Sequence, residues 1–255
     1  MSDAVLEAIQ VRRTFPSRGG AVAALDGVSA RVRRGETLAL VGESGSGKST
    51  LGRLMLALDV PTSGRVEFHG VDLASVAPAE LRSLRRRIQP VFQDPGESLD
   101  PRMTIRQSLE EPLRIHGMGG ARERTGRVSQ ILSFTGLPPD VADRLPHALS
   151  GGQRQRAGIA RALMLEPECL VADEPTSALD VSLQAQIVNL LLDLQERRGT
   201  SIVLIAHDLR LVAQMAHWVA VMRQGTVVEE GPTEQVLGAP THPYTRALLA
   251  AVPAR

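Results

Sequence analysis

Three short runs of apolar residues along this chain each end at a glycine or a polar residue. The runs cover residues 37–41, 169–172 and 201–206, and the residues that follow them are Gly42, Asp173 and His207. Runs of this length and composition predict buried β-strands. Because the carboxyl ends of parallel strands meet at one edge of a sheet, the pattern predicts a mostly parallel α/β sheet with its functional site at that edge.

Apolar residues at helical spacing follow the first two of these strands. The first helix presents four of them on one face: Leu51, Leu54, Met55 and Leu58. The second helix, between the last two strands, presents another four: Ile187, Leu190, Leu191 and Leu194. For this second helix we predict Ser182 as the amino-terminal cap and Gly199 as the stop.

Two regions depart from this alternation of strands and helices. The alternating stretch 65–69, bounded by Gly64 and Gly70, predicts an antiparallel sheet beside the core. From about residue 94 to about residue 165 the strand signal fades and helical patterns dominate, including 121–134 and the stretch after Ser150. We interpret this second region as an inserted α-helical subdomain.

The stretch GESGSGKST, residues 42–50, matches the pattern GxxxxGK[ST] between a predicted strand and a predicted helix. Glycines in this pattern let backbone N–H groups surround phosphate oxygens, and the positive end of the helix favours the anion. We therefore predict a phosphate-binding loop rather than a glycine-rich turn without a ligand. The predicted nucleotide-binding residues of the loop are Gly42, Glu43, Ser44, Gly45, Ser46, Gly47, Lys48, Ser49 and Thr50.

Lys48 is the single lysine among the 29 lysines and arginines of the chain. A lysine is a compact point charge that can reach between terminal phosphates, whereas the planar fork of arginine needs more room than a tight loop leaves. We therefore predict that this position requires lysine. The hydroxyl group of Ser49 is a predicted ligand of magnesium.

Acidic residues follow the second predicted strand. Asp173 can hold magnesium through water, and the adjacent Glu174 can accept a proton from an attacking water. Glu174 is the predicted general base, and a surface acid at a strand end is the alternative. His207 taken alone would be a structural histidine, but its place at the end of the third strand makes it a candidate for the site. Cys169 is predicted to be a small core residue rather than a reactive thiol.

The composition of the chain restricts the kinds of partner and the cellular location that we expect for the protein. The 28 acidic residues nearly balance the basic ones and leave a formal net charge of +1, which gives no reason to expect a nucleic-acid partner. With Cys169 as the single cysteine, neither an intramolecular disulfide nor a cysteine-built metal site is expected. The acidic amino terminus is unlike a secretory signal, and no stretch approaches the roughly 18 apolar residues of a membrane span. These features predict a cytosolic protein.

The motif LSGGQ at residues 149–153 resembles the signature of ABC ATPases. The phosphate loop, VFQDP around Gln93, this signature, CLVADEPTSALD and His207 follow one another in that family's order, so the resemblance covers essentially the whole chain. It implies a P-loop NTPase (RecA-like) core with an antiparallel β subdomain and an α-helical signature subdomain. It implies one ABC ATPase domain over residues 1–255, divided into 1–93, 94–165 and 166–255.

The resemblance also assigns roles to single residues. It implies that Phe15 stacks on adenine, although a core role for this residue stays open. Gln93 matches the residue that senses magnesium and the attacking water, and Asp180 matches an acid that communicates across a dimer. His207 matches the residue that holds the γ-phosphate and positions the water of Glu174. Implied catalytic residues are Glu174, His207, Lys48 and Gln93, and implied magnesium ligands are Ser49, Gln93 and Asp173.

The signature has a physical interpretation of its own. Ser150 can cap a helix that begins near Gly151 or Gly152 and points its positive end at an anion. In the family that anion belongs to ATP bound by the opposite subunit, so Ser150, Gly151, Gly152 and Gln153 would contact the nucleotide in trans. The resemblance therefore implies a head-to-tail pair with two ATP molecules, formed with a second copy or with a paralogue.

Finer features resemble one branch of the family, the ATP-binding subunits of peptide and nickel importers. These features are FQDPGESLDPRMTI, EPTSALDVSLQAQI and THPYTRALLAAVP. They imply an ATP-hydrolysing motor at the cytoplasmic face of the membrane, with two permease subunits and a separate solute-binding protein as partners. The chain departs from the branch at Gly96, Glu97 and Asp100, which weakens the inference about which permease it contacts. No iron–sulfur cluster is expected.

Several alternatives remain open at this point. A nickel or metal-chelate importer belongs to the same branch, and dipeptide, oligopeptide, nickel chelate and glutathione are all possible solutes. A soluble ATPase in a cytosolic enzyme complex of the phosphonate-degradation type is the alternative from a different class. DNA-repair and translation ATPases are less favoured, because they usually carry long coiled-coil insertions or two ATPase units. The cluster of Arg82, Arg85, Arg86 and Arg87 is interpreted as a solvated helix face rather than a contact for lipid or permease.

Overall fold

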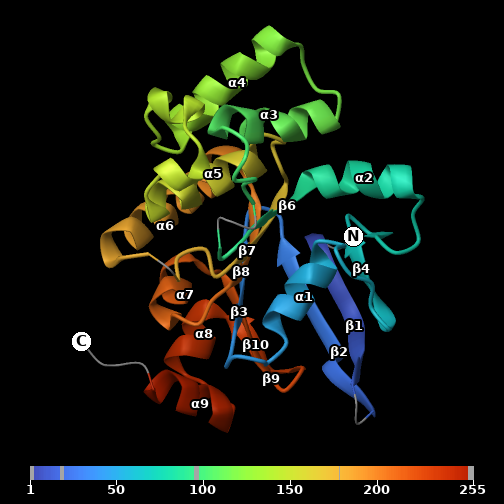
Figure 1. Ribbon diagram of the computed structural model, residues 1–255. Coiled ribbons are helices and arrows are strands. Elements are labelled where there is room, and N and C mark those ends of the chain that lie inside the picture. Colours follow the sequence, from blue (N-terminus) through green and yellow to red (C-terminus); the bar gives the residue numbers. More distant parts are fainter. Residues whose placement is uncertain (1–2, 18–19, 95–97, 178, 252–255) are drawn as a thin grey trace.

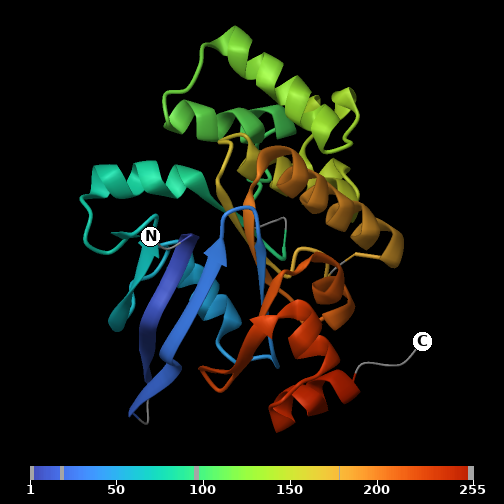
Figure 2. The same ribbon diagram turned by 180° about the vertical axis from the view of Figure 1, so that it is seen from behind.

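The computed structural model describes residues 3–17, 20–94, 98–177 and 179–251. Its elements form two β-sheets with helices packed around and between them (Figure 1). The same arrangement seen from behind shows α3 and α4 at one end of the molecule and α8 and α9 at the other (Figure 2). Of the residues described, no helix is both long enough and apolar enough to cross a membrane.

The larger sheet has six strands in the order β10-β9-β3-β8-β7-β6. Its strands are β3 (Thr37–Val41), β6 (Ile88–Val91), β7 (Cys169–Asp173), β8 (Ser201–Ile205), β9 (Trp218–Arg223) and β10 (Thr226–Pro232). All neighbouring pairs are parallel except β9 with β10. Every residue of β3 and β8 is buried, as expected for strands covered on both faces. The predicted mostly parallel sheet is confirmed, and its three predicted strands lie side by side.

The smaller sheet is antiparallel and has the order β2-β1-β4-β5. Its strands are β1 (Ala4–Ser17), β2 (Gly20–Arg33), β4 (Ser63–Phe68) and β5 (Val71–Asp72). Residues 65–68 of the predicted stretch therefore do belong to an antiparallel sheet beside the core, and His69 follows the end of β4.

Helix α1 (Lys48–Met55) lies between the two sheets. Leu51, Leu54 and Met55 are buried in one cluster with side chains of both sheets. The prediction that Leu58 extends this apolar face was wrong, because the helix ends at Met55 and Leu58 is 47% exposed. Gly52 lets the helix approach the sheet closely, since a Cβ atom there would lie 2.8 Å from Cδ1 of Ile205.

Helices replace strands between β6 and β7. They are α3 (Ile105–Ile115), α4 (Ala121–Phe134) and α5 (Gly151–Leu163), with two 3₁₀ turns at Pro139–Asp143 and Pro146–Ala148. The predicted helix 121–134 is confirmed at both ends. Figure 1 shows these helices gathered at one end of the sheet. The boundaries of the predicted subdomain at residues 94 and 165 stay a prediction.

The amino-terminal cap of helix α6 (Val181–Arg198) is Asp180 and not Ser182, so the predicted cap was wrong. The Asp180 carboxylate accepts a hydrogen bond from the backbone N–H of Leu183 at 2.9 Å, which places Ser182 inside the first turn. Gly199 ends the helix as predicted, in the left-handed conformation with φ of 63°. The remaining helices are α2 (Pro78–Arg87), α7 (Leu209–Met215), α8 (Thr233–Gly238) and α9 (Pro243–Ala250).

Arg82 and Arg85 of α2 are exposed, as expected for a solvated helix face, but their side chains also contact neighbouring segments of the chain. Arg82 donates to the carbonyl of Ile115 at 2.7 Å, and Arg85 donates to the carbonyl of Ala57. Arg87 forms an ion pair with Glu168. The cluster therefore ties α2 to neighbouring segments of the chain.

Candidate functional site

The loop between β3 and α1 is held against neighbouring backbone, and glycine is required for that contact. Gly42 has φ of 147°, and a Cβ atom there would lie 2.1 Å from the carbonyl oxygen of Met222. Gly47 has φ of 105°, and a Cβ atom there would lie 2.7 Å from the carbonyl oxygen of Ala24. No side chain caps the first turn of α1, so its N–H groups remain available to an anion, as the phosphate-loop pattern predicts.

Lys48 extends back into the loop that precedes it. Its ammonium group donates to the carbonyls of Gly42 at 2.7 Å and Glu43 at 2.8 Å, and to the Ser46 hydroxyl at 3.3 Å. The side chain is only 7% exposed. Burial lowers the pKa of Lys48 from its ordinary value, while nearby carboxylates, Glu174 foremost, act in the opposite direction. The ammonium is thus held inside the ring that the loop forms.

Ser49 and Asp173 bring two oxygen atoms together from two different elements. The Ser49 hydroxyl donates to Oδ1 of Asp173 at 3.3 Å, which joins the start of α1 to the end of β7. A hydroxyl and a carboxylate are the hard oxygen ligands that Mg²⁺ prefers. Across the described part of the chain, no group of three or more His, Cys, Asp and Glu side chains could hold a metal ion. Two oxygen ligands of this kind fit an ion that takes its remaining ligands from water and phosphate.

Glu174 and His207 lie at the same edge of the sheet, beyond the ends of β7 and β8. Oε2 of Glu174 is 3.4 Å from Nδ1 of His207. Glu174 has a left-handed backbone with φ of 45°, and its N–H donates to the carbonyl of Ile205 at 2.9 Å. This conformation is uncommon for a non-glycine residue, and five other described non-glycine residues of the chain share it. Both side chains line a hollow of about 60 Å³, wide enough for water.

The signature motif lies at the start of α5 and is capped as predicted. The Ser150 hydroxyl accepts from the N–H of Gln153 at 3.2 Å, and the Gln153 side chain accepts from the N–H of Ser150 at 3.0 Å. Ser150 and Gly151 are exposed, while Gly152 is buried against the side chain of Leu183. Figures 1 and 2 show α5 beside α3 and α4, away from the phosphate loop at the start of α1. Within one chain, the structure does not bring these two motifs together.

The other predicted residues occupy different places. Phe15 is 39% exposed on β1 with the guanidinium of Arg13 stacked 4.7 Å from its ring, so it is not a core residue. Gln93 lines a separate hollow of about 340 Å³ with Gly151 and Arg154. Asp180 is the cap of α6.

Cys169 is fully buried, and burial raises the pKa of its thiol well above the ordinary range, so its predicted core role is confirmed.

The segment that departs from the importer branch is described only in part. Gly96 and Glu97 lie outside the described residues. Asp100 forms an ion pair with Arg102 at 2.8 Å, and this guanidinium lowers the pKa of Asp100 to about 2.

Two contacts at the phosphate loop were not predicted from the sequence. The Tyr244 hydroxyl, on α9, accepts a hydrogen bond from the N–H of Glu43 at 3.1 Å. In the β9–β10 turn, the N–H of Gly225 donates to the carbonyl of Ser46 at 3.0 Å. Both partners are far from the loop along the chain, so neither periodicity nor the loop motif could have revealed them.

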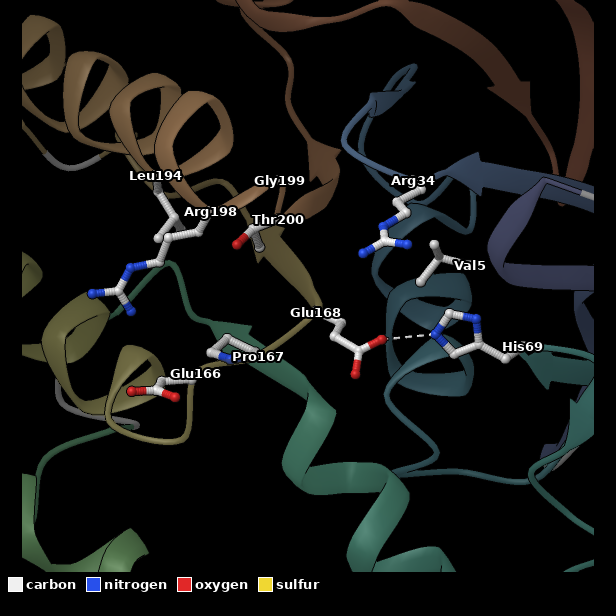
Figure 3. A pocket seen from close by; sticks show the side chains of 10 residues that line it. All are labelled: Val5, Arg34, His69, Glu166, Pro167, Glu168, Leu194, Arg198, Gly199 and Thr200. Atoms are coloured by element: carbon white, nitrogen blue, oxygen red, sulfur yellow. Dashed lines mark hydrogen bonds and ion pairs between the residues drawn. The ribbon is translucent and has the colours of Figure 1, made fainter.

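A hollow of about 440 Å³ lies at the opposite edge of the large sheet (Figure 3). Arg34, Glu168 and Thr200, which precede β3, β7 and β8, are among the residues that line it. Glu168 lies 2.8 Å from the His69 ring and also pairs with Arg87. Glu166, Glu168, Arg34 and Arg198 all line this hollow, so the formal charges of its acidic and basic residues balance. Glu168 links the two sheets to the end of α2.

The fold and the loop around Lys48 define a P-loop NTPase of α/β class. Comparison with known families then narrows the class. Residues 25–177 match the model described as ABC transporter, and residues 228–255 match the model described as oligopeptide/dipeptide transporter, C-terminal region. The chain belongs to the ABC transporter family.

Similar curated proteins carry names from one branch of this family. Over 92% of its length the chain is 55% identical to the oligopeptide transport ATP-binding protein OppD of Mycobacterium tuberculosis, and it spans 38% of that protein. It is 51% identical to a putative peptide import ATP-binding protein of Brucella ovis, covering 94% of this chain and 75% of that protein.

Solved structures of ATP-binding cassettes have the same fold. The dimeric post-hydrolysis state of the cassette MJ0796 bound to ADP and Pi has a TM-score of 0.82 and 32% identity, covering 89% of this chain and 98% of that one. CbiO1 of Clostridium perfringens, part of the ABC transporter complex cbiONQ, has a TM-score of 0.82 and 31% identity. It covers 93% of this chain and 92% of that one.

Proposed function

We propose that this protein is the ATP-hydrolysing motor subunit of a membrane ABC importer for di- or oligopeptides. The observation that carries the proposal is the convergence of Lys48, the Ser49–Asp173 pair and the Glu174–His207 pair at the carboxyl edge of the sheet. The match of residues 228–255 to the oligopeptide/dipeptide region and the peptide-import names of the relatives support the choice of solute.

Hydrolysis in this proposal is a phosphoryl transfer from ATP to water. The water oxygen forms a bond to the γ-phosphorus, the bond between the γ-phosphorus and the oxygen that bridges to the β-phosphate breaks, and ADP and phosphate leave. Glu174 accepts the proton of the attacking water, and His207 keeps that carboxylate and the γ-phosphate in place. Lys48 places its positive charge between the phosphates. Mg²⁺, held by Ser49 and Asp173 with the predicted help of Gln93, would neutralise phosphate charge when bound.

The same proposal requires a second subunit. Ser150, Gly151, Gly152 and Gln153 lie at an exposed helix start away from the phosphate loop of their own chain, which supports a contact with nucleotide on the opposite subunit. We propose a head-to-tail dimer with a second copy or a paralogue, in which Asp180 communicates between the subunits. Phe15 supplies a partly exposed ring on which adenine can stack. The dimer acts on two permease subunits at the cytoplasmic face of the membrane, and a separate binding protein selects the solute.

The test is to identify what the closed dimer contacts. Tagged Glu174→Gln protein is purified from its native cell in mild detergent with Mg-ATP, and the associated chains are identified by mass spectrometry. The same variant without nucleotide is the control. Two multi-span permease subunits, retained only with nucleotide, are expected. Recovery of soluble enzymes in their place would contradict the transport function and leave the ATPase chemistry standing.

A further inference from the structure

Tyr244 joins the carboxyl-terminal segment of the chain to the first peptide group of the phosphate loop. Its hydroxyl oxygen accepts the hydrogen bond from the N–H of Glu43 at 3.1 Å. The side chain is only 7% exposed, and the guanidinium of Arg223 is stacked 4.9 Å from the ring centre. The hydroxyl is therefore held at the loop by packing on the ring as well as by the hydrogen bond itself.

The peptide group that Tyr244 contacts also holds Lys48. The N–H of Glu43 and the C=O of Gly42 belong to the same peptide plane, and this carbonyl accepts from the Lys48 ammonium at 2.7 Å. In a trans peptide the N–H and C=O groups point in opposite directions. The Gly42–Glu43 peptide is thus fixed on its outer side by Tyr244 and on its inner side by Lys48.

Helix α9 is itself anchored to the large sheet. Glu229 of β10 accepts hydrogen bonds from the N–H groups of Thr241 at 2.7 Å and His242 at 3.1 Å. The His242 ring caps α9 by accepting from the N–H of Tyr244 at 3.1 Å. The hydroxyl of Tyr244 is therefore placed by a chain of contacts that begins in the core sheet and ends at the phosphate loop.

We propose that Tyr244 is a positioning residue for Lys48 and acts through the Gly42–Glu43 peptide. By fixing the plane of this peptide, it fixes the carbonyl that orients the ammonium toward nucleotide phosphates. The inference rests on the proposed function, because it needs the loop to bind ATP. It makes the contacts of Glu229, His242 and Tyr244 determinants of nucleotide affinity, although none of these three is a predicted ATP-binding residue.

The test compares two variants of α9 that each lose one side-chain hydrogen bond. Tyr244→Phe removes the hydroxyl and keeps the ring, whereas Arg246→Ala removes the 3.0 Å bond from Arg246 to the Pro240 carbonyl. We expect Tyr244→Phe to raise the Kd for Mg-ATP about 3- to 10-fold, the effect of losing one ordinary hydrogen bond, and Arg246→Ala to leave it unchanged. An unchanged Kd in Tyr244→Phe would overturn the proposal.

A double-mutant cycle shows whether the effect passes through Lys48. In a Lys48→Ala background, Tyr244→Phe is expected to change the Kd for Mg-ATP by less than about 2-fold, because the group it positions is gone. The same loss in both backgrounds would overturn the proposed route. Tyr244 is the single tyrosine of the chain, so 3-fluorotyrosine gives one ¹⁹F resonance. This resonance is expected to shift on addition of Mg-ATP in the wild type and to stay in place in Lys48→Ala.

The two proposals fail in different ways. If the wild-type protein does not bind Mg-ATP, the proposed function is wrong. Hydrogen exchange of the Glu43 amide still tests the contact in that case, and it is expected to be faster in Tyr244→Phe than in Arg246→Ala. Equal exchange in the two variants would contradict the positioning role even if ATP binds.

Discussion

The carboxylate of Glu174 lies 3.4 Å from the ring of His207, and the two residues follow neighbouring strands of the large sheet. The N–H of Glu174 is bonded to the carbonyl of Ile205, the last residue of β8, so the backbone of one strand places the side chain beside the other. The left-handed conformation of Glu174 is part of this placement. In the proposed hydrolysis, a carboxylate so held would be oriented before the substrate binds, which lowers the entropic cost of reaching the transition state.

Replacement of Glu174 by glutamine tests its role as general base. The amide keeps the shape of the side chain but cannot accept the proton, so ATP turnover is expected to fall by about 10² to 10⁴, while ATP binding is retained. Glu166→Gln is a matched control, because Glu166 also has a left-handed backbone, with φ of 52°, but lines the hollow at the opposite edge of the sheet. Steady-state turnover and equilibrium binding of ATP measure the two effects. Near-normal turnover in Glu174→Gln would remove this residue from the role.

Lys48→Arg tests whether the loop requires a compact cation. The ammonium lies within 2.8 Å of two loop carbonyls in a buried site, and a planar guanidinium needs a wider space. We expect at least a 10-fold loss of ATP turnover, and Lys48→Ala is expected to weaken ATP binding itself. Arg53→Lys, on an exposed position of the same helix, is the reverse substitution and is expected to be neutral. Normal hydrolysis by Lys48→Arg would refute the geometric explanation for the single lysine.

Comparison of Ser150→Ala with Thr104→Ala separates the capping role of Ser150 from its proposed contact with nucleotide. Ser150 with Gln153 and Thr104 with Gln107 form the same reciprocal capping box, on α5 and α3 respectively. Each alanine variant is expected to lower the free energy of unfolding by about 1 kcal/mol, measured by urea denaturation. Only Ser150→Ala is expected also to weaken ATP-dependent dimerisation, measured by sedimentation in the Glu174→Gln background. Equal dimerisation in both variants would contradict the trans contact.

The lowered pKa of Glu229 predicts that the folded protein loses stability in acid. Although partial burial acts in the opposite direction, the Thr245 side chain and the hydrogen bonds from Thr241 and His242 keep the pKa of Glu229 at about 2. A group whose pKa is depressed on folding stabilises the protein above its ordinary pKa and loses this effect as it is protonated. The free energy of unfolding is therefore expected to fall as the pH decreases from about 4.5 toward 2. Glu229→Gln should show a shallower fall, and identical pH profiles would disprove the assignment.

Sequence patterns predicted the parts of the fold that depend on neighbouring residues. The buried strands β3, β7 and β8 follow from short apolar runs, and Ser150 and Gly199 were identified as helix ends because capping is a local effect. The cap of α6 was missed because Asp180 and Ser182 compete within two positions and only the backbone conformation decides between them. Leu58 fits the helical spacing, yet the helix ends before it.

The parts that could not be predicted depend on long-range contacts. The bond between Glu43 and Tyr244 joins residues 201 positions apart, and the THPYTRALLAAVP stretch suggested only a branch of the family. Periodicity gives no information on which distant backbone group a buried hydroxyl will contact. The same limit applies to the close approach of Gly42 to Met222. That glycine is required at residue 42 becomes clear only when β3 and β9 are paired.

The burial of Cys169 makes the protein well suited to site-specific labelling. Its thiol lies within the core and has a raised pKa, so maleimide reagents will react slowly with it in the folded state. A cysteine introduced on the surface therefore becomes the preferred target without prior removal of the native one. Spin labels at exposed positions outside the proposed nucleotide contacts, such as Arg53 in one preparation and Arg122 in another, would report subunit association as a distance.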